Sequence, residues 1–199
     1  MQNKKMPTVV MIRAALLGAI GSVLMQFELR LPIFPAFLSL DISDLPALIG
    51  AITSGPLVGL LSSLIKNLLN PILFGTNTGG VGNFANFVIG TALVVPIGFI
   101  YQKRKNVFGY LMGSAVGIVT MVSVAVIMNY FVLLPLYSEI FIPMDRILEI
   151  ANAVNSNVTD VFTLVLFAIV PFNLLKGGIT VTLGYGLFRA LTPILKKIS

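Results

Sequence analysis

Three polar side chains near the C-terminal end of the sequence lie in a segment that is otherwise apolar. Asn173, Lys176 and Thr180 are spaced i, i+3 and i+7, so they share one face of a helix. An amide group both donates and accepts hydrogen bonds, whereas an ammonium group only donates them. Together they suit a flat heterocycle whose edge alternates carbonyl groups and ring nitrogens. The alternative is structural, with Asn173 and Lys176 bonded to neighbouring helices or to an outer-loop acid.

Other apolar segments also carry polar side chains. Polar groups inside a bilayer are costly and need partners, so they are the place to look for a functional site. Asn67 and Asn129 are candidate ligand contacts for this reason. Lys66 is a candidate too, but it shares a helix face with Asn70, and the pair is well placed to brace the loop that holds Asp41.

The residues that most catalytic sites need are missing. The sequence has no histidine and no cysteine, which excludes an imidazole base, a thiolate nucleophile and a Cys/His metal site. Walker A, HExxH and GxSxG motifs are also absent, so the sequence predicts neither an enzyme nor an autonomous ATPase. The acids, Asp41 and Asp44 included, fall on predicted outer loops or helix ends, which argues against a proton- or sodium-coupled carrier. An autonomous carrier or channel for another solute is the alternative.

The elements that must hold these polar residues are membrane helices. Of the 199 residues, 57% are hydrophobic and 10% are charged, against about 25% charged in an average soluble domain. The apolar N-terminal run is longer than a signal peptide's core and lacks a clear cleavage site, so we take it as the first helix. The sequence predicts an all-α integral membrane protein with one membrane domain over residues 1–199. Its six predicted transmembrane segments are 8–27, 45–53, 57–74, 83–101, 107–134 and 158–191.

Proline and glycine divide the first three segments. Pro32 and Pro35 exclude a regular helix from the long apolar loop after the first segment. Asp44 is the predicted N-cap of the second segment. The Gly55-Pro56 pair then separates the second segment from the third.

The later part of the chain predicts two further features. Apolar residues recur at helical spacing over residues 147–154, within a more polar stretch, and predict a short amphipathic helix on the surface. Pro171 predicts a kink in the sixth segment, which is too long for one straight span.

The basic residues predict an orientation. With six spans, most of the 13 Lys and Arg residues fall on the side of the N-terminus, and the opposite loops receive Arg30 and Arg146. Because cytoplasmic loops carry the excess of Lys and Arg, both termini are expected in the cytoplasm.

Small residues in the first segment predict a close helix contact. Ala15 and Ala19 form one small-xxx-small pair, and Ala14 and Gly18 form another. Such pairs let a second helix approach closely. The contact is either with a partner protein or with another helix of the same chain.

Several short blocks resemble a known family. They are Phe27-Glu28 with Pro32 and Pro35, LDISDLPALIGA, GPLVG, Lys66-Asn67, Asn129-Tyr130 with Pro135, and PFNLLKGG at residues 171–178. From about residue 8 to residue 192, the chain is similar to the riboflavin-binding S components of energy-coupling factor (ECF) transporters.

This resemblance implies a six-helix bundle with a vitamin pocket near the outer face, covered by a lid made from the long loop after the first helix. It implies that Asn129, Asn173 and Lys176 bind the edge of the isoalloxazine ring. Riboflavin or FMN would be bound as the transported substrate, with no cofactor or metal. Glu28, Asp41 and the turn at 76–78 are candidates for the polar ribityl chain, and each is equally suited to be a solvated loop residue.

The resemblance also implies partners in the plasma membrane of a bacterium. Ala15 and Ala19 match a motif that docks onto a transmembrane coupling subunit, which two ATPase subunits drive. The stretch from Pro143 to Asp160 is long for an outer loop of this family. Because of this departure, the choice between riboflavin and FMN as the ligand stays open. An S component for a sibling vitamin is a further alternative.

Overall fold

The computed structural model describes residues 7–76 and 78–198 of the protein, with side chains as far as Pro193. The described chain is almost entirely helical, and its strand-like pairing is one isolated bridge between Leu29 and Leu40. The helices are α1 (Thr8–Leu24), α2 (Asp44–Ser54), α3 (Pro56–Phe74), α4 (Val81–Lys103), α5 (Val107–Met128), the π-helix η1 (Asn129–Leu133), α6 (Leu134–Ile140), α7 (Met144–Val154), α8 (Val161–Leu164), the π-helix η2 (Val165–Ile169) and α9 (Val170–Ile198).

Two pairs of helices are continuous through a π-helical turn. α5, η1 and α6 form one rod, and α8, η2 and α9 form a second. Each π-turn comes just before a proline, Pro135 or Pro171, which lacks an N–H and crowds the carbonyl one turn earlier. A widened turn accommodates that ring. The prediction at Pro171 was a kink, and the structure has the π-helix η2 just before this proline; the π-helix before Pro135 was not predicted.

Four helical rods are long and apolar enough to cross a membrane by length and composition: α3, α4, and the two composite rods from Val107 and Val161. α1 and α2 are apolar but shorter, with 17 and 11 residues. The ends of several segments differ from those predicted. α1 ends at Leu24 instead of residue 27, and the fifth segment continues to Ile140.

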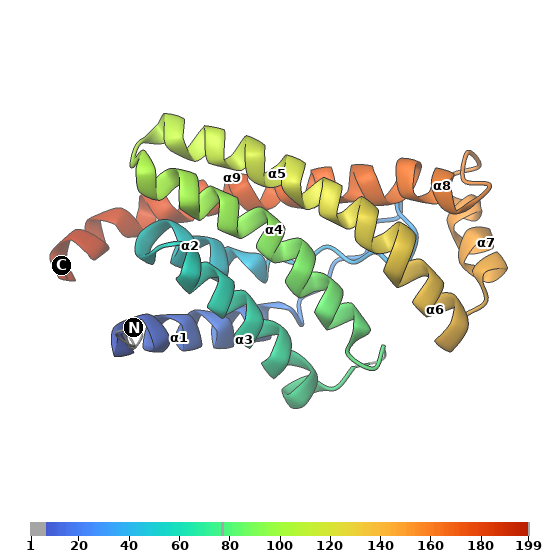
Figure 1. Ribbon diagram of the computed structural model, residues 1–199, viewed down its shortest axis with the longest axis horizontal. Coiled ribbons are helices and arrows are strands. Elements are labelled where there is room, and N and C mark those ends of the chain that lie inside the picture. Colours follow the sequence, from blue (N-terminus) through green and yellow to red (C-terminus); the bar gives the residue numbers. More distant parts are fainter. Residues whose placement is uncertain (1–6, 77, 199) are drawn as a thin grey trace, which may run out of the picture.

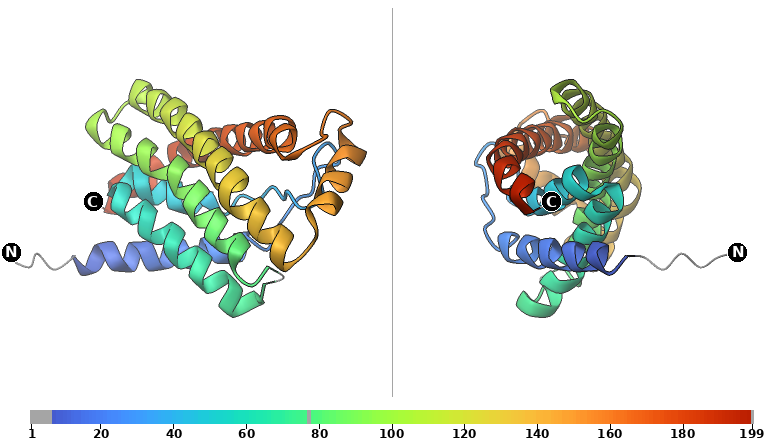
Figure 2. Two further views of the ribbon diagram at one scale, coloured as in Figure 1. Left: turned by 45° about the vertical axis from the view of Figure 1, so that its right-hand side comes forward. Right: turned by 90° about the vertical axis from the view of Figure 1, so that its left-hand side faces the viewer.

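The helices pack around a small aliphatic core. α1 lies against α2 and α3, α4 lies against α3 and α5, and α9 contacts α5 and α2 (Figures 1 and 2). The start of α1, the end of α9 and the α4–α5 turn lie at one end of the molecule, and α7 lies at the other (Figure 1). The buried core includes Leu48, Ala51, Leu93, Ile97 and Met121.

The predicted amphipathic helix is confirmed as α7. Ile147 and Ala151 on one face are buried in an apolar cluster with residues of η2. Asp145, Arg146 and Glu149 on the other face are exposed, and Arg146 pairs with Glu149. α7 therefore caps the end of the molecule that lies away from the termini.

The segment between α1 and α2 is not helical, as its prolines predicted. Leu29 and Leu40 exchange backbone hydrogen bonds of 2.7 and 2.9 Å, which draws the segment into a hairpin-like loop. Phe34 is buried and packs edge-on against Phe172 of α9, with 5.3 Å between ring centroids. This loop, residues 25–43, therefore packs into the bundle and brings Asp41 to α9.

Candidate functional site

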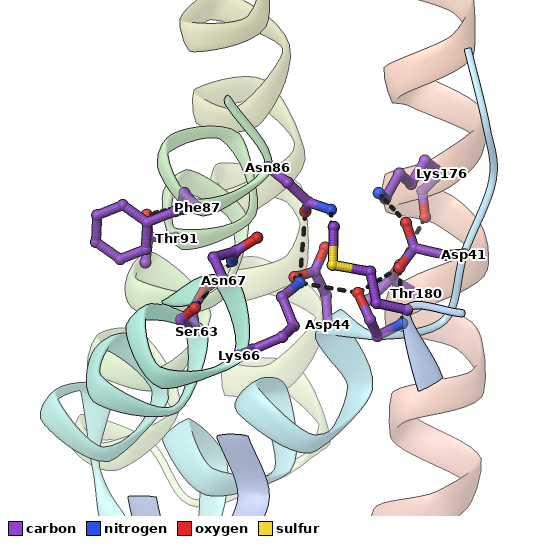
Figure 3. A network of polar contacts seen from close by, with 12 residues as sticks. Asp41, Asp44, Ser63, Lys66, Asn67, Asn86, Phe87, Thr91, Lys176 and Thr180 are labelled. Carbon is purple, nitrogen blue, oxygen red and sulfur yellow. Dashed lines mark hydrogen bonds and ion pairs between the residues drawn. The ribbon is translucent and has the colours of Figure 1, made fainter. Parts of the chain in front are cut away.

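A buried ion pair joins the loop at 25–43 to α9. Lys176 Nζ lies 2.8 Å from Asp41 Oδ2, and the two residues are 8% and 5% exposed (Figure 3). The other carboxylate oxygen of Asp41 accepts hydrogen bonds from the backbone N–H and the hydroxyl of Ser43. Burial alone would raise the pKa of Asp41, but the ammonium groups of Lys176 and Lys66 and these hydrogen bonds hold that pKa well below its usual range. Asp41 is therefore ionised in the folded protein at neutral pH.

A second buried ion pair lies beside the first. Lys66 Nζ on α3 lies 2.6 Å from Asp44 Oδ1 at the start of α2, and both residues are 1% exposed. Lys66 also donates to the Ser43 hydroxyl at 2.9 Å, so Ser43 links the two pairs. Two lysines and two aspartates thus form one network of balanced charge.

Gly90 allows α4 to approach this network closely, because it has no side chain. A Cβ on Gly90 would lie 2.7 Å from Asp44 Oδ1, which no side chain could occupy without displacing the carboxylate. Asn86, one turn earlier on α4, offers its Oδ1 to Lys66 at 3.4 Å. Helices α2, α3 and α4 are therefore fixed around the Lys66–Asp44 pair.

One prediction about the acids was wrong, and their burial was not predicted. Asp44 is the first residue of α2 and not its N-cap; Ser43 precedes the helix, and no side chain caps it. Asp41 lies in the loop at 25–43 and Asp44 at the start of α2, which agrees with the predicted loop and helix-end positions, but both are buried, which the sequence did not indicate. The reason is that each buried lysine needs an anionic partner, and these two aspartates supply it. The argument against an ion-coupled carrier therefore loses this support.

The predicted amides are placed in a common way. Asn67, Asn129 and Asn173 each donate one N–H to the carbonyl four residues earlier, at 2.8 Å. This leaves the second N–H and the carbonyl oxygen of each amide for another partner. Thr180 is buried and donates to the carbonyl of Lys176 at 2.8 Å.

The structure brings together some predicted site residues but not others. Asn173, Lys176 and Thr180 lie on the buried face of α9, and Asp41 meets that face. Lys66 is engaged by Ser43 and Asp44, which is the bracing role foreseen as its alternative. Within the described residues, Glu28 and the turn at 76–78 form no side-chain hydrogen bond or ion pair with this network, although the charge of Glu28 lies near enough to act on Lys176.

Asn129 lies on η1, outside the ion-pair network, whereas Asn67 directly follows Lys66 on α3 but makes its hydrogen bond to the Ser63 carbonyl. Asn129 begins η1, which contacts η2, and Asn173 follows η2 by one turn. Asn67 is 5% exposed, and its Oδ1 finds no hydrogen-bond partner within the described residues. An unpaired buried acceptor costs free energy, so it marks a position where a donor would be stabilising.

Sequence reasoning missed Ser43, Asp44 and Gly90. Two lysines inside apolar segments required two anions, and that requirement was the signal for Asp44 as well as for Asp41. Within the described residues, no group of three acidic, His or Cys side chains could hold a metal ion.

The two small-residue pairs of α1 face different ways. Ala14 and Gly18 are buried, and Gly18 lies against Ile65 and the Ser62 carbonyl of α3. Ala15 and Ala19 are exposed on the outer side of α1. The helix contact within the chain therefore uses Ala14 and Gly18, and Ala15 and Ala19 remain exposed.

Comparison with known proteins covers nearly the whole chain. Residues 9–188 match the family model described as "ECF transporter, substrate-specific component". The chain is 36% identical to the riboflavin transporter RibU of Staphylococcus aureus (strain TCH60), over 99% of this chain and 95% of that protein. It is 32% identical to the riboflavin transporter FmnP of Bacillus subtilis (strain 168), over 94% of each. A solved structure described as the S component of a bacterial ECF transporter matches with a TM-score of 0.74 at 31% identity, over 96% of this chain and 99% of that chain.

Proposed function

The chain belongs to the substrate-specific components of ECF transporters, and on this basis we propose that it captures riboflavin outside the cell and delivers it for ATP-driven uptake. It is a multi-pass membrane protein and a transporter component, not an enzyme. The observation that carries the proposal for the site is the buried polar face of α9, where Asn173 and Lys176 meet Asp41 of the loop at 25–43.

The polar face of α9 suits the edge of a flavin ring. Asp41 takes one of the three hydrogens of the Lys176 ammonium group, so two remain for a ring carbonyl. The free N–H and carbonyl groups of Asn173 and Asn129 can pair with the ring's alternating acceptors and donor. Asn67 and Thr180 are proposed as further contacts, and Glu28 and Asp41 as partners of the ribityl hydroxyl groups.

The loop at 25–43 is the proposed lid. It reaches α9 through the Asp41–Lys176 ion pair and through Phe34 against Phe172, and it reaches α3 through Ser43, which accepts a hydrogen bond from Lys66. A lid that carries Asp41 would orient the Lys176 ammonium as it closes, so closure and ligand binding would depend on each other. Asp41 acts here as a positioning residue for Lys176.

The proposed topology is one membrane domain with six passes and both termini in the cytoplasm. α1 and α2 supply the two passes that are shorter than a usual span. The exposed Ala15 and Ala19 would dock onto a transmembrane coupling subunit that two ATPases drive. Small side chains there allow close helix contact.

The test is an absorption spectrum of the detergent-purified protein before any ligand is added. A visible flavin band, released on denaturation, is the expected result, and mass spectrometry of the released pigment then distinguishes riboflavin from FMN. A colourless protein that also fails to quench the fluorescence of added riboflavin would overturn the proposal. Riboflavin uptake by the pure protein in vesicles without the ATPases would overturn the partner requirement.

A further inference from the structure

A cavity with basic and aromatic residues in its lining lies at the opposite end of the bundle from α7. Its volume is about 200 Å³, and it is lined by residues from the α4–α5 turn and the last turns of α9. Figure 1 shows these two segments at the end where α1 begins. The residues that matter are Tyr101, Lys105, Asn106, Tyr185, Phe188 and Arg189. None of them belongs to the site proposed for flavin.

The cavity carries positive charge from two segments far apart in sequence. Lys105 and Arg189 both line it, and neither forms an ion pair with a carboxylate of the described residues. The N-terminus of α5 lies in the same wall, because Val107 begins that helix and also lines the cavity. Asn106 caps α5 through its Oδ1, which leaves its amide N–H groups as donors. Two cations, helix N–H groups and an amide favour an anion with several oxygens.

Aromatic rings form the rest of the wall. Tyr101 packs edge-on against Phe188 with 5.5 Å between centroids, and the Arg189 guanidinium lies 5.9 Å from the Tyr185 centroid. Tyrosines and basic residues gather where a membrane helix passes through the headgroup layer. Val107 and Leu187 beside them are exposed apolar side chains, which suits a ligand with an apolar part.

We propose that this cavity binds the phosphate group of an anionic phospholipid from the membrane leaflet at the end that carries the termini. The guanidinium of Arg189 and the ammonium of Lys105 bind the phosphate oxygens, and the acyl chains lie along the exposed apolar residues of α5 and α9. Basic pockets between membrane helices are suited to anionic headgroups. Free inorganic phosphate offers the same oxygens but no acyl chains.

The test is thermal unfolding of the purified protein in neutral detergent with added phosphatidylglycerol, or with phosphatidylcholine of the same acyl chains. Phosphatidylglycerol is expected to raise the midpoint temperature of unfolding, and phosphatidylcholine is not. In the double variant Lys105→Gln/Arg189→Gln, the lipid concentration for half-maximal stabilisation should rise roughly thirtyfold, as two lost charges of about 1 kcal/mol each imply. The single variant Lys105→Gln, on the exposed turn, should raise that concentration roughly fivefold. It replaces the double variant if the latter does not fold.

The matched control neutralises two cations at the same end that do not line the cavity. Lys103 lies 4.2 Å from the Phe99 ring centroid, and the Arg104 guanidinium lies 6.0 Å from that of Phe108. The variant Lys103→Gln/Arg104→Gln should keep the response to phosphatidylglycerol. An equal loss in this control, or an unchanged response in the cavity variants, would overturn the proposal. An equal stabilisation by inorganic phosphate would also overturn it, because the site would then bind a free anion. Riboflavin titration of each variant reports separately on the flavin site.

Discussion

The Lys176 ammonium is held by Asp41 at 2.8 Å and is also the charged donor proposed to bind flavin. A mutation must separate these roles. Lys176→Ala is expected to weaken riboflavin binding by about 1–3 kcal/mol, as for a charge-assisted hydrogen bond. It should also lower the free energy of unfolding by about 3–5 kcal/mol, because Asp41 is left buried and unpaired. Fluorescence quenching gives the first quantity, and denaturation in detergent gives the second.

The matched control for that experiment is the neutral pair Asp41→Asn/Lys176→Gln. Two amides of similar size remove both charges, so much of the lost stability should return, while the riboflavin affinity stays low. Recovery of both quantities in the double variant would show that Lys176 is structural and does not bind the ring.

Riboflavin affinity is expected to be nearly independent of pH between about pH 5 and pH 8. The chain has no histidine, the side chain that ordinarily titrates in this range. The pKa of Asp41 is lowered, so its contribution to stability is complete above the ordinary aspartate value of about 3.9 and is lost as the pH falls below it toward the folded-state pKa. Titrations at several pH values test this expectation. A pronounced change in affinity near neutrality would mean that another ionising group contacts the flavin.

Single residues were only partly readable from the sequence. Lys176 and Asn173 stood out because polar groups are rare in apolar segments, and the pairing of Lys176 with an outer-loop acid was foreseen as an alternative. The acid that pairs with Lys66 was not foreseen. Asp41 and Lys176 are 135 positions apart, and such pairing is set by how the helices pack rather than by local spacing.

At the scale of elements, the composite rods explain why helix existence was easier to predict than helix ends. Apolar length and proline positions fixed the break between α2 and α3 and the irregular loop at 25–43. The predicted fifth segment ends at residue 134, yet the helix continues through Pro135 by way of η1. Whether a proline ends a helix or widens it depends on neighbours, here the contact between η1 and η2.

The contact of α2 with α4 leads to a prediction about Gly90. In Gly90→Ala, the new Cβ would meet Asp44 Oδ1 at 2.7 Å, so the Lys66–Asp44 pair must shift. We expect a loss of about 1–3 kcal/mol in the free energy of unfolding. Gly186→Ala is the control, because nothing lies within 4 Å of its Cβ position, and it should be neutral or slightly stabilising. Equal midpoints for the two variants would contradict the close packing.

The outer face of α1 leads to a prediction about uptake. Ala15→Trp is expected to leave riboflavin binding unchanged and to abolish uptake in cells that contain the partner subunits, because a bulky ring blocks close helix contact. Ile20→Trp, exposed on a different side of α1, should retain uptake. If Ala15→Trp loses riboflavin binding as well, that face packs within the chain.

At the scale of the whole molecule, charge is separated along the bundle. The buried lysines are balanced by Asp41 and Asp44, so the core is neutral overall. Lys103, Arg104, Lys105 and Arg189 then give one end a basic rim, while α7 carries acids at the other end. This asymmetry predicts that the basic end faces the cytoplasm, since cytoplasmic loops retain Lys and Arg.

The absence of native cysteine allows that orientation to be tested directly. Arg104→Cys on the α4–α5 turn and Asp145→Cys on α7 place one thiol at each end, at positions that are exposed. In intact cells, a membrane-impermeant maleimide should label Asp145→Cys, and it should label Arg104→Cys only after the membrane is opened. The reverse pattern would place the basic rim outside. It would also put the lipid cavity and the flavin site in the leaflets opposite to those proposed. Labelling of both variants in intact cells would mean that the number of passes between the two positions is even, so that the rod from Val107 to Ile140 does not cross the membrane.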